Sequence, residues 1–172
     1  MGNAFDYLDW RGDLPFSADP FSDVDNLILC ELAYTDLDGV VPESGVSVSI
    51  REARDRYFEL HTREEILART NSVRLAPLLL DKAADTRRYA DLRLSDYMNI
   101  IDADRDEQIS AVTCEVGDGT FYTAFRGTDD SITGWKEDFS LCFRTTAGQQ
   151  RAVRYLNDVF AGRDVKLRVG GH

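Results

Sequence analysis

The residues from Phe125 to Asp138 have types and spacing that suit acyl-transfer chemistry. An apolar run ends at Phe125, the chain turns at Gly127, and a hydroxyl residue, Thr128, follows directly. An enzyme that cleaves an ester or amide needs fixed donors aimed at the oxygen that becomes negative in the tetrahedral intermediate. A backbone N–H at the turn after a strand supplies such a donor. We therefore identify Thr128 as a candidate oxyanion donor.

Other residues of this segment are expected to hold the turn. Arg126 and Asp138 form a plausible ion pair, because a guanidinium fork fits a carboxylate with two parallel hydrogen bonds. Asp129 is expected either to orient Thr128 or to cap the backbone that follows, and capping is the more common use. Trp135 either lines an acyl pocket or packs on the sheet, and both uses stay open. Without this context, residues 126–128 would be an ordinary turn after a strand.

The last 64 residues, 109–172, predict the elements that would position this turn. Residues 109–116 and 120–125 are apolar on both alternating faces and flank an Asp-Gly turn, which predicts a hairpin of central strands covered on both sides. Residues 147–160 have an apolar stripe at helical spacing, and 165–169 form a last strand. Strand, helix and strand make a β-α-β unit, for which parallel pairing is the default. The chain therefore reaches Gly171 and His172 at the carboxyl edge of the sheet, where open α/β folds bind ligands.

The first half of the chain, residues 1–107, is expected to be mainly helical and to form a cap or flank over the sheet. The first 23 residues, rich in Asp, Pro, Gly and aromatics, are expected to form an irregular arm, and 40–48 a loop. Residues 108–172 would then supply the first sheet strands and the crossover helix, so that 1–172 is one part of a single domain. Helical spacing and capping residues predict helices over 24–34, 49–60, 62–68 and about 77–88.

Two motifs resemble a known family. Arg126-Gly127-Thr128, followed by Trp135 and Asp138, resembles the oxyanion loop of the class 3 lipase branch of the α/β-hydrolases. The end of the chain, Gly171-His172, is similar to the first two letters of a G-H-S-x-G nucleophile elbow, and the opening residues 5–13 resemble an uncharacterised bacterial family of lipase-like proteins. The resemblance implies an α/β fold with an α/β-hydrolase-like sheet flanked by helices, of which this chain is the amino-terminal part and ends at the elbow.

The same resemblance implies a function. It predicts a serine hydrolase of lipase or esterase type that acts on an ester or related acyl bond of a small molecule. Thr128 would contribute to the oxyanion hole, supported by Gly127, Asp129, Gly171 and His172. The nucleophilic serine, the acid and the base are absent from these residues, so the 172-residue chain by itself is expected to be inactive. The alternative is a non-catalytic interaction module on a lipase-like scaffold, since a fold does not establish chemistry.

Composition narrows the classes of partner. A formal net charge of −11 opposes binding to nucleic acid and to anionic membrane surfaces. The sequence has no run of about 18 apolar residues, so no membrane span is predicted. Three dispersed cysteines and the lack of an amino-terminal signal favour a reducing, cytoplasmic setting. No cofactor or metal is expected, because the acidic run from Asp102 has Glu107 and Thr113 where a calcium loop needs glycine and glutamate. The oligomeric state stays open.

Overall fold

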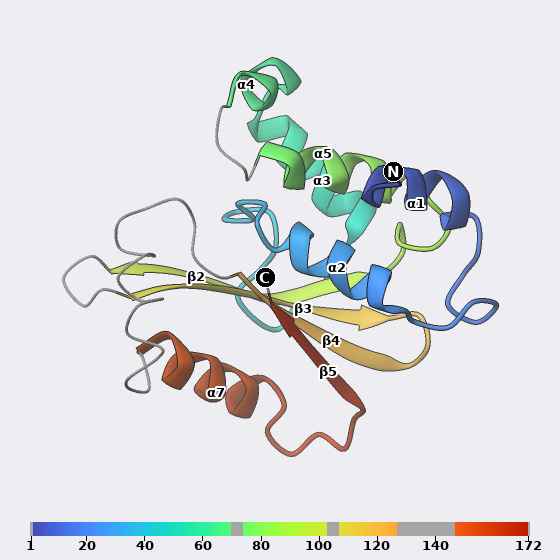
Figure 1. Cartoon of the computed structure of the whole chain (residues 1–172). Coiled ribbons are helices and arrows are strands. Elements are labelled where there is room, and N and C mark those ends of the chain that lie inside the picture. The colour runs from blue at the N-terminus through green and yellow to red at the C-terminus, as the bar shows by residue number, and fades with distance from the viewer. Residues whose placement is uncertain (1, 70–73, 103–106, 127–146, 172) are drawn as a thin grey trace.

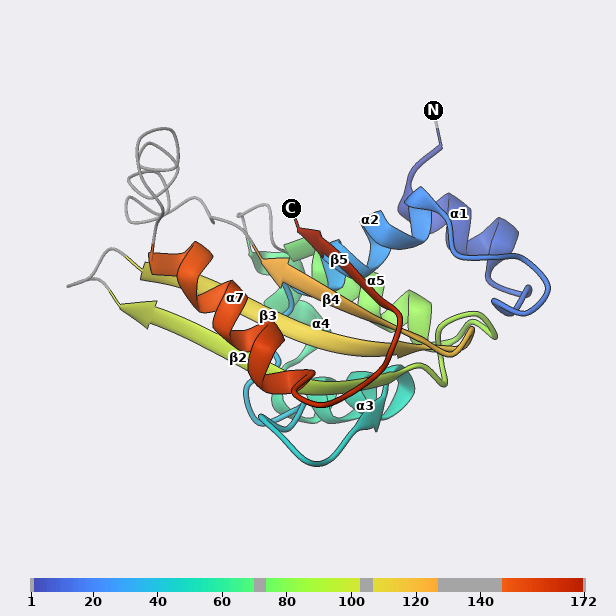
Figure 2. The same cartoon turned by 90° about the horizontal axis from the view of Figure 1, so that it is seen from below.

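The computed structural model shows a mixed five-stranded sheet with helices on both faces. It describes residues 2–69, 74–102, 107–126 and 147–171. Helices α1 to α5 lie together on one face of the sheet, and of the described helices α7 lies on the other (Figure 1). The view from below shows α7 in front of the strands and the other helices behind them (Figure 2). The expected α/β class, with a sheet covered on both sides, is confirmed.

The helices and strands have the following bounds. The helices are α1 (Ala4–Arg11), α2 (Asp23–Leu32), α3 (Ile50–Leu60), α4 (Arg63–Ala68), α5 (Leu75–Ala84) and α7 (Ala147–Val159). The strands are β1 (Val48–Ser49), β2 (Arg93–Asp102), β3 (Glu107–Val116), β4 (Thr120–Arg126) and β5 (Leu167–Gly171).

The strands follow one another across the sheet in sequence order, β1-β2-β3-β4-β5. The first three pairings are antiparallel, and β4 pairs with β5 in parallel through the α7 crossover. Both the expected hairpin and the expected parallel β-α-β unit are therefore confirmed. Because two reversals separate β2 from β4, strands β2, β4 and β5 all run in one direction.

Short-range capping explains where several helices begin. Four of the described helices begin with a capping box, in which the cap side chain accepts a hydrogen bond from a backbone N–H of the first turn. An acidic residue three positions later accepts from the backbone N–H of the cap residue. The cap residues are Asn3, Ser22, Ser49 and Thr62. The irregular arm predicted for the first 23 residues is wrong over α1, because Asn3 and Asp6 form one of these boxes. The helices predicted over 24–34, 49–60, 62–68 and 147–160 are confirmed, with shifts of a few residues at their ends.

Two further differences concern residues 75–102. Helix α5 ends at Ala84, four residues before the predicted end, because the N–H of Arg88 donates to the carbonyl of Gly12 at 2.9 Å instead of continuing the helix. Strand β2 was not foreseen within the half expected to be mainly helical. A register shift between Ser95 and Met98 explains this, since a bulge breaks the alternation by which a strand is recognised.

A buried ion pair fastens the amino-terminal arm to the helical layer. The guanidinium of Arg88 donates to both carboxylate oxygens of Asp25 at 2.7 Å, and both side chains are fully buried. The same guanidinium donates to the carbonyls of Leu14 and Asp19 at 3.0 and 2.9 Å and lies 4.0 Å from the ring centre of Phe16. One side chain thereby satisfies several carbonyls of an irregular segment inside the core.

Two smaller expectations are also met. Cys30 and Cys114 are buried and free, as expected of small apolar side chains, while Cys142 lies outside the described residues. In the part of the chain that the structure describes, none of the helices has the length and apolar character needed to cross a bilayer.

Candidate functional site

The carboxyl ends of β4 and β5 lie side by side. Their parallel register aligns Phe125 with Gly171 and Ala124 with Gly170. The two strands therefore end at the same edge of the sheet. The sequence predicted this common edge from the parallel β-α-β unit.

The described residues include two of the predicted site residues. Arg126 is the last residue of β4 and Gly171 the last of β5, so they lie at the ends of neighbouring strands. The other predicted residues lie outside the described residues: Gly127, Thr128, Asp129, Asp138 and His172. Their roles stay predictions, and the described strand ends fix only the positions from which the chain continues toward them.

Arg126 is held by a hydrogen-bonded chain that crosses the sheet. Its Nη2 donates to Oδ1 of Asn99 at 2.9 Å, and Nδ2 of Asn99 donates to Oδ2 of Asp38 at 3.0 Å. Ser110 of β3 is the register partner of both Asn99 and Arg126, so the guanidinium reaches across the middle strand. The end of β4 is thereby tied to the loop that follows α2.

The Nε of Arg126 is buried, and no acceptor for it lies among the described residues. A buried guanidinium N–H without a partner is costly, and a carboxylate is the acceptor that best matches its geometry. The predicted pairing with Asp138 would supply one. That pairing stays a prediction, because Asp138 lies outside the described residues.

On the helical side, β5 passes very close to a buried polar cluster. The hydroxyl of Tyr122 donates to Oδ1 of Asn26 at 2.7 Å and lies 2.9 Å from the Sγ of Cys30. A Cβ atom at Gly170 would lie 1.8 Å from this hydroxyl and 2.6 Å from Oδ1 of Asn26. Only a residue without a side chain fits there, so α2 and β4 together fix the position of the strand that leads to Gly171.

This cluster also excludes one candidate nucleophile. Burial raises the pKa of the Cys30 thiol, and the nearby Glu31 carboxylate raises it further, although the hydrogen bond with Tyr122 acts in the opposite direction. Because the thiolate is the reactive form, a thiol with a raised pKa is a poor nucleophile at neutral pH. Cys30 is therefore a structural residue.

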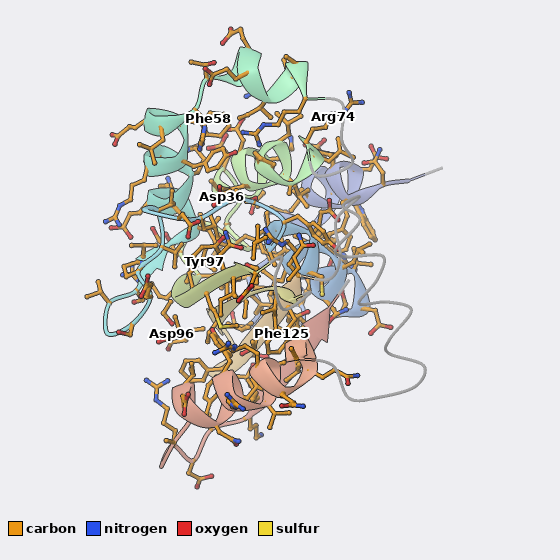
Figure 3. The ribbon with its side chains drawn as sticks, turned by 90° about the vertical axis from the view of Figure 1, so that its left-hand side faces the viewer. Asp36, Phe58, Arg74, Asp96, Tyr97 and Phe125 are labelled. Carbon is orange, nitrogen blue, oxygen red and sulfur yellow. The ribbon has the colours of Figure 1, made fainter. Side chains whose placement is uncertain are left out.

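The opposite face of the strand ends is supported by α7. The ring of Phe125 packs edge-on against Tyr155 with centroids 5.8 Å apart, and the hydroxyl of Tyr155 donates to the carbonyl of Asp96 at 2.6 Å. The same hydroxyl lies 2.9 Å from Oγ1 of Thr113. Figure 3 shows Tyr97 on the side of β2 nearer the helical layer and Phe125 between the sheet and α7. The edge at which β4 and β5 end is thus packed from both sides.

Sequence reasoning missed Asn99 and Asp38, the two residues that hold Arg126. Neither belongs to a recognisable motif, and their partnership depends on β2, whose bulge hides its strand pattern. The run from Met98 to Ile101, with two adjacent isoleucines, is a weak strand signal that β-propensity favours. Nothing in the spacing from Asp38 to Arg126 indicates that one asparagine would join them.

The arrangement can present backbone donors from one loop beside the end of a neighbouring strand. Stabilisation of a developing negative charge requires donors that are held in place before the substrate arrives, and the described strand ends are held by packing on both sides. Among the described residues, no group of three or more histidine, cysteine, aspartate or glutamate side chains could hold a metal ion.

Comparison with known protein families gives a match. A family model described as Mbeg1-like matches residues 83–172, which is more than half of the chain and includes β2 to β5 and α7. No curated protein and no solved structure matches the chain significantly.

Proposed function

The chain belongs to the Mbeg1-like family, and from the geometry of its matched segment we propose that the protein is part of a serine hydrolase. The proposed enzyme is of lipase or esterase type and cleaves an ester or a related acyl bond of a small molecule. The observation that carries the proposal is the parallel register of Phe125 with Gly171. It supports an oxyanion loop and a nucleophile elbow that leave the sheet side by side.

The proposal assigns a class 3 lipase arrangement to this sheet. Strands β4 and β5 with the α7 crossover form the β-α-β unit, and the elbow follows β5. Gly171 and His172 begin the elbow, and a serine after His172 attacks the acyl carbon. The backbone N–H of Thr128, together with that of the residue after the serine, holds the oxyanion. A histidine and an aspartate from later residues of the longer protein supply the base and its orienting group.

Arg126 has a positioning role in this mechanism. It joins the start of the oxyanion loop to Asn99 on β2, so the loop begins from a fixed point. Asp138 completes the scaffold by accepting from the remaining guanidinium N–H groups. Since the benefit of an oxyanion donor depends on its being held in place before reaction, these residues act on catalysis through Thr128.

The first test is covalent labelling with a fluorescent phosphonate that reacts with activated serines. The residues that follow His172 in the longer protein are sequenced first, and Ser-x-Gly is expected. The longer protein should then label in its native state. The variant with alanine in place of that serine and the 172-residue chain should both stay unlabelled.

Two results would contradict the hydrolase. If no serine follows His172, the proposed nucleophile does not exist. If the serine is present but the phosphonate does not label it, the serine is not activated. The second result favours the alternative function, a non-catalytic interaction module. Esterase activity from the pure 172-residue chain would contradict the proposed nucleophile.

A second prediction concerns the oxyanion donor. Thr128→Pro removes the backbone N–H at this position, whereas Thr128→Ala keeps it. Loss of one oxyanion donor typically lowers kcat by about 10²- to 10³-fold. We expect a fall of that order in the longer protein for the proline variant and a much smaller effect for alanine, with circular dichroism confirming that both variants fold. Equal kcat values in two folded variants would remove Thr128 from the oxyanion hole.

A further inference from the structure

A cavity of about 530 Å³ lies where β2, α7 and the loop after α2 meet. Its volume falls within the range of ligand-binding pockets in proteins. It opens beside β2, whereas the candidate hydrolase site lies at the ends of β4 and β5. The charged side chains that line it are Asp38, Glu43, Asp96, Arg151, Arg154 and Asp158.

Among the described residues, the edge of β2 beside this cavity has little strand pairing. Strand β1 pairs with β2 only at Arg93 and Leu94, and no other described strand pairs with that side of β2. The view from below shows the carboxyl half of β2 at the margin of the sheet (Figure 2). Such an edge presents main-chain donors and acceptors that another strand can use.

Backbone geometry identifies which groups face outward. The N–H of Tyr97 donates to the carbonyl of Pro42 at 3.1 Å, on the side of β2 away from β3. Alternate residues of a strand direct their N–H and C=O groups to the same side, so Asn99 and Ile101 also present their main chain to the open edge. Ile101 is 65% exposed, and its side chain gives an arriving strand an apolar contact.

A bulge places a carboxylate next to these groups. Asp96 has a φ of 54°, the left-handed region that is uncommon for a residue with a side chain, and it lies within the register shift of β2. Its carbonyl accepts from the hydroxyl of Tyr155, and its carboxylate accepts from Oγ of Ser95 at 2.6 Å. Bulges often redirect a side chain, and this one brings Asp96 to the lining of the cavity.

The charges select the kind of ligand. Four carboxylates and two guanidinium groups line the cavity, and the whole chain carries a net charge of −11. A ligand with positive charge is therefore attracted both locally and over the whole surface. A small cation would use the carboxylates but leave the main-chain groups of Asn99 and Ile101 unpaired, whereas a peptide strand uses both.

We propose that β2 binds an extended basic peptide segment by strand addition, with the segment's lysine or arginine side chains in the cavity. Main-chain hydrogen bonds to Asn99 and Ile101 supply the pairing, as in other cases where a peptide extends a sheet. The carboxylates of Glu43, Asp96 and Asp158 select for positive side chains. This inference does not depend on the hydrolase, and the cavity shares the side chains of Asp38 and Asn99 with the hydrogen-bonded chain that holds Arg126.

The first test separates strand pairing from charge. A fluorescein-labelled peptide of alternating lysine and valine is titrated with the 172-residue protein, and anisotropy gives the Kd. We expect saturable binding, at least tenfold weaker binding when alternate peptide nitrogens are methylated, and no binding when glutamate replaces lysine. Equal binding of the methylated peptide would overturn strand addition.

A pair of variants tests the same point on the protein. Ile101→Pro removes an outward N–H at an edge position, where proline is tolerated, and Ile101→Ala shortens the side chain but keeps the N–H. Ile101→Pro should lose most of the binding while its circular dichroism stays that of the native protein, and Ile101→Ala should lose much less. Wild-type binding by the proline variant would place the peptide elsewhere.

The carboxylates are tested by removing one charge at a time. Glu43→Gln and Asp158→Asn should each weaken binding by roughly two- to fivefold, the effect expected for an exposed ion pair. Asp164→Asn removes the same charge from an exposed residue outside the cavity lining and should leave Kd unchanged at 0.15 M salt. Equal effects of all three variants would mean non-specific attraction, and spermidine binding as tightly as the peptide would mean a cation site. Either outcome would contradict the proposal.

Discussion

Gly170→Ala is expected to lower the free energy of unfolding by about 3 kcal/mol, at the upper end of the usual cost of overpacking a core. The added Cβ would lie 1.8 Å from the hydroxyl of Tyr122, and that hydroxyl is fixed by its contacts with Asn26 and Cys30. Neither β5 nor the tyrosine can move aside without breaking buried hydrogen bonds. Urea denaturation followed by circular dichroism measures the change.

Gly171→Ala provides a matched control one residue later in the same strand. A Cβ there meets nothing closer than 3.4 Å, so we expect a change below about 1 kcal/mol. Tyr122→Phe removes the clashing oxygen and should restore part of the stability that Gly170→Ala loses. If the two alanine variants were equally stable, the close approach of β5 to Tyr122 would be wrong. If the proposed hydrolase is correct, Gly170→Ala should also reduce its phosphonate labelling, because β5 leads into the proposed elbow.

The second large effect is expected for Arg88→Met, which should lower the free energy of unfolding by about 3–5 kcal/mol. The substitution leaves the carboxylate of Asp25 buried without its charged partner. It also removes the donors to the carbonyls of Leu14 and Asp19. Urea denaturation at pH 7 measures the loss, and limited proteolysis should detect release of residues 12–22 from the helical layer.

Arg63→Met is the matched control for this substitution. Arg63 also pairs with an aspartate, Asp81, but its side chain is 58% exposed, so its removal should cost less than about 1 kcal/mol. Adding Asp25→Asn to Arg88→Met should cost little further, because it removes the charge that the first substitution leaves unpaired. Similar losses for Arg63→Met and Arg88→Met would contradict a dominant role for the buried pair.

The pH dependence of the same pair has a definite sign. Burial alone would raise the pKa of Asp25, but hydrogen bonds from Arg88, Tyr89 and Ser22 outweigh it and hold the pKa below its ordinary value of 3.8. The ionised carboxylate therefore stabilises the wild-type fold above that value, and this stabilisation is lost as the pH falls through the folded pKa. In Arg88→Met, burial without the guanidinium should raise the pKa of Asp25, so the stability gap between the two proteins should start to narrow above pH 3.8 and narrow further as the pH falls below it.

The elements predicted correctly are those encoded over short distances. The Asp-Gly turn between β3 and β4, the apolar stripe of α7 and the capping box at Thr62 each lie within a few residues of the structure that they determine. Parallel pairing of β4 with β5 followed as well, because a strand, helix and strand of these lengths favours it. The capping box at Asn3 was equally local, so α1 could also have been predicted.

Around the candidate site, too, local features could be predicted from the sequence and long-range contacts could not. The amino-acid sequence alone determined that a helix follows β4 and that a strand leading into two glycines follows this helix, because each pattern is local. The turn predicted at Gly127 lies outside the described residues. Only the tertiary structure decided that Arg126 contacts Asn99, that Tyr122 occupies the space beside Gly170, and that Arg88 pairs with Asp25. The residues in each of these contacts are separated by between 27 and 63 positions in the sequence. Tertiary packing determines which residues meet, and no spacing in the sequence specifies it. In addition, the bulge at Asp96 masks the strand pattern of β2, which carries Asn99.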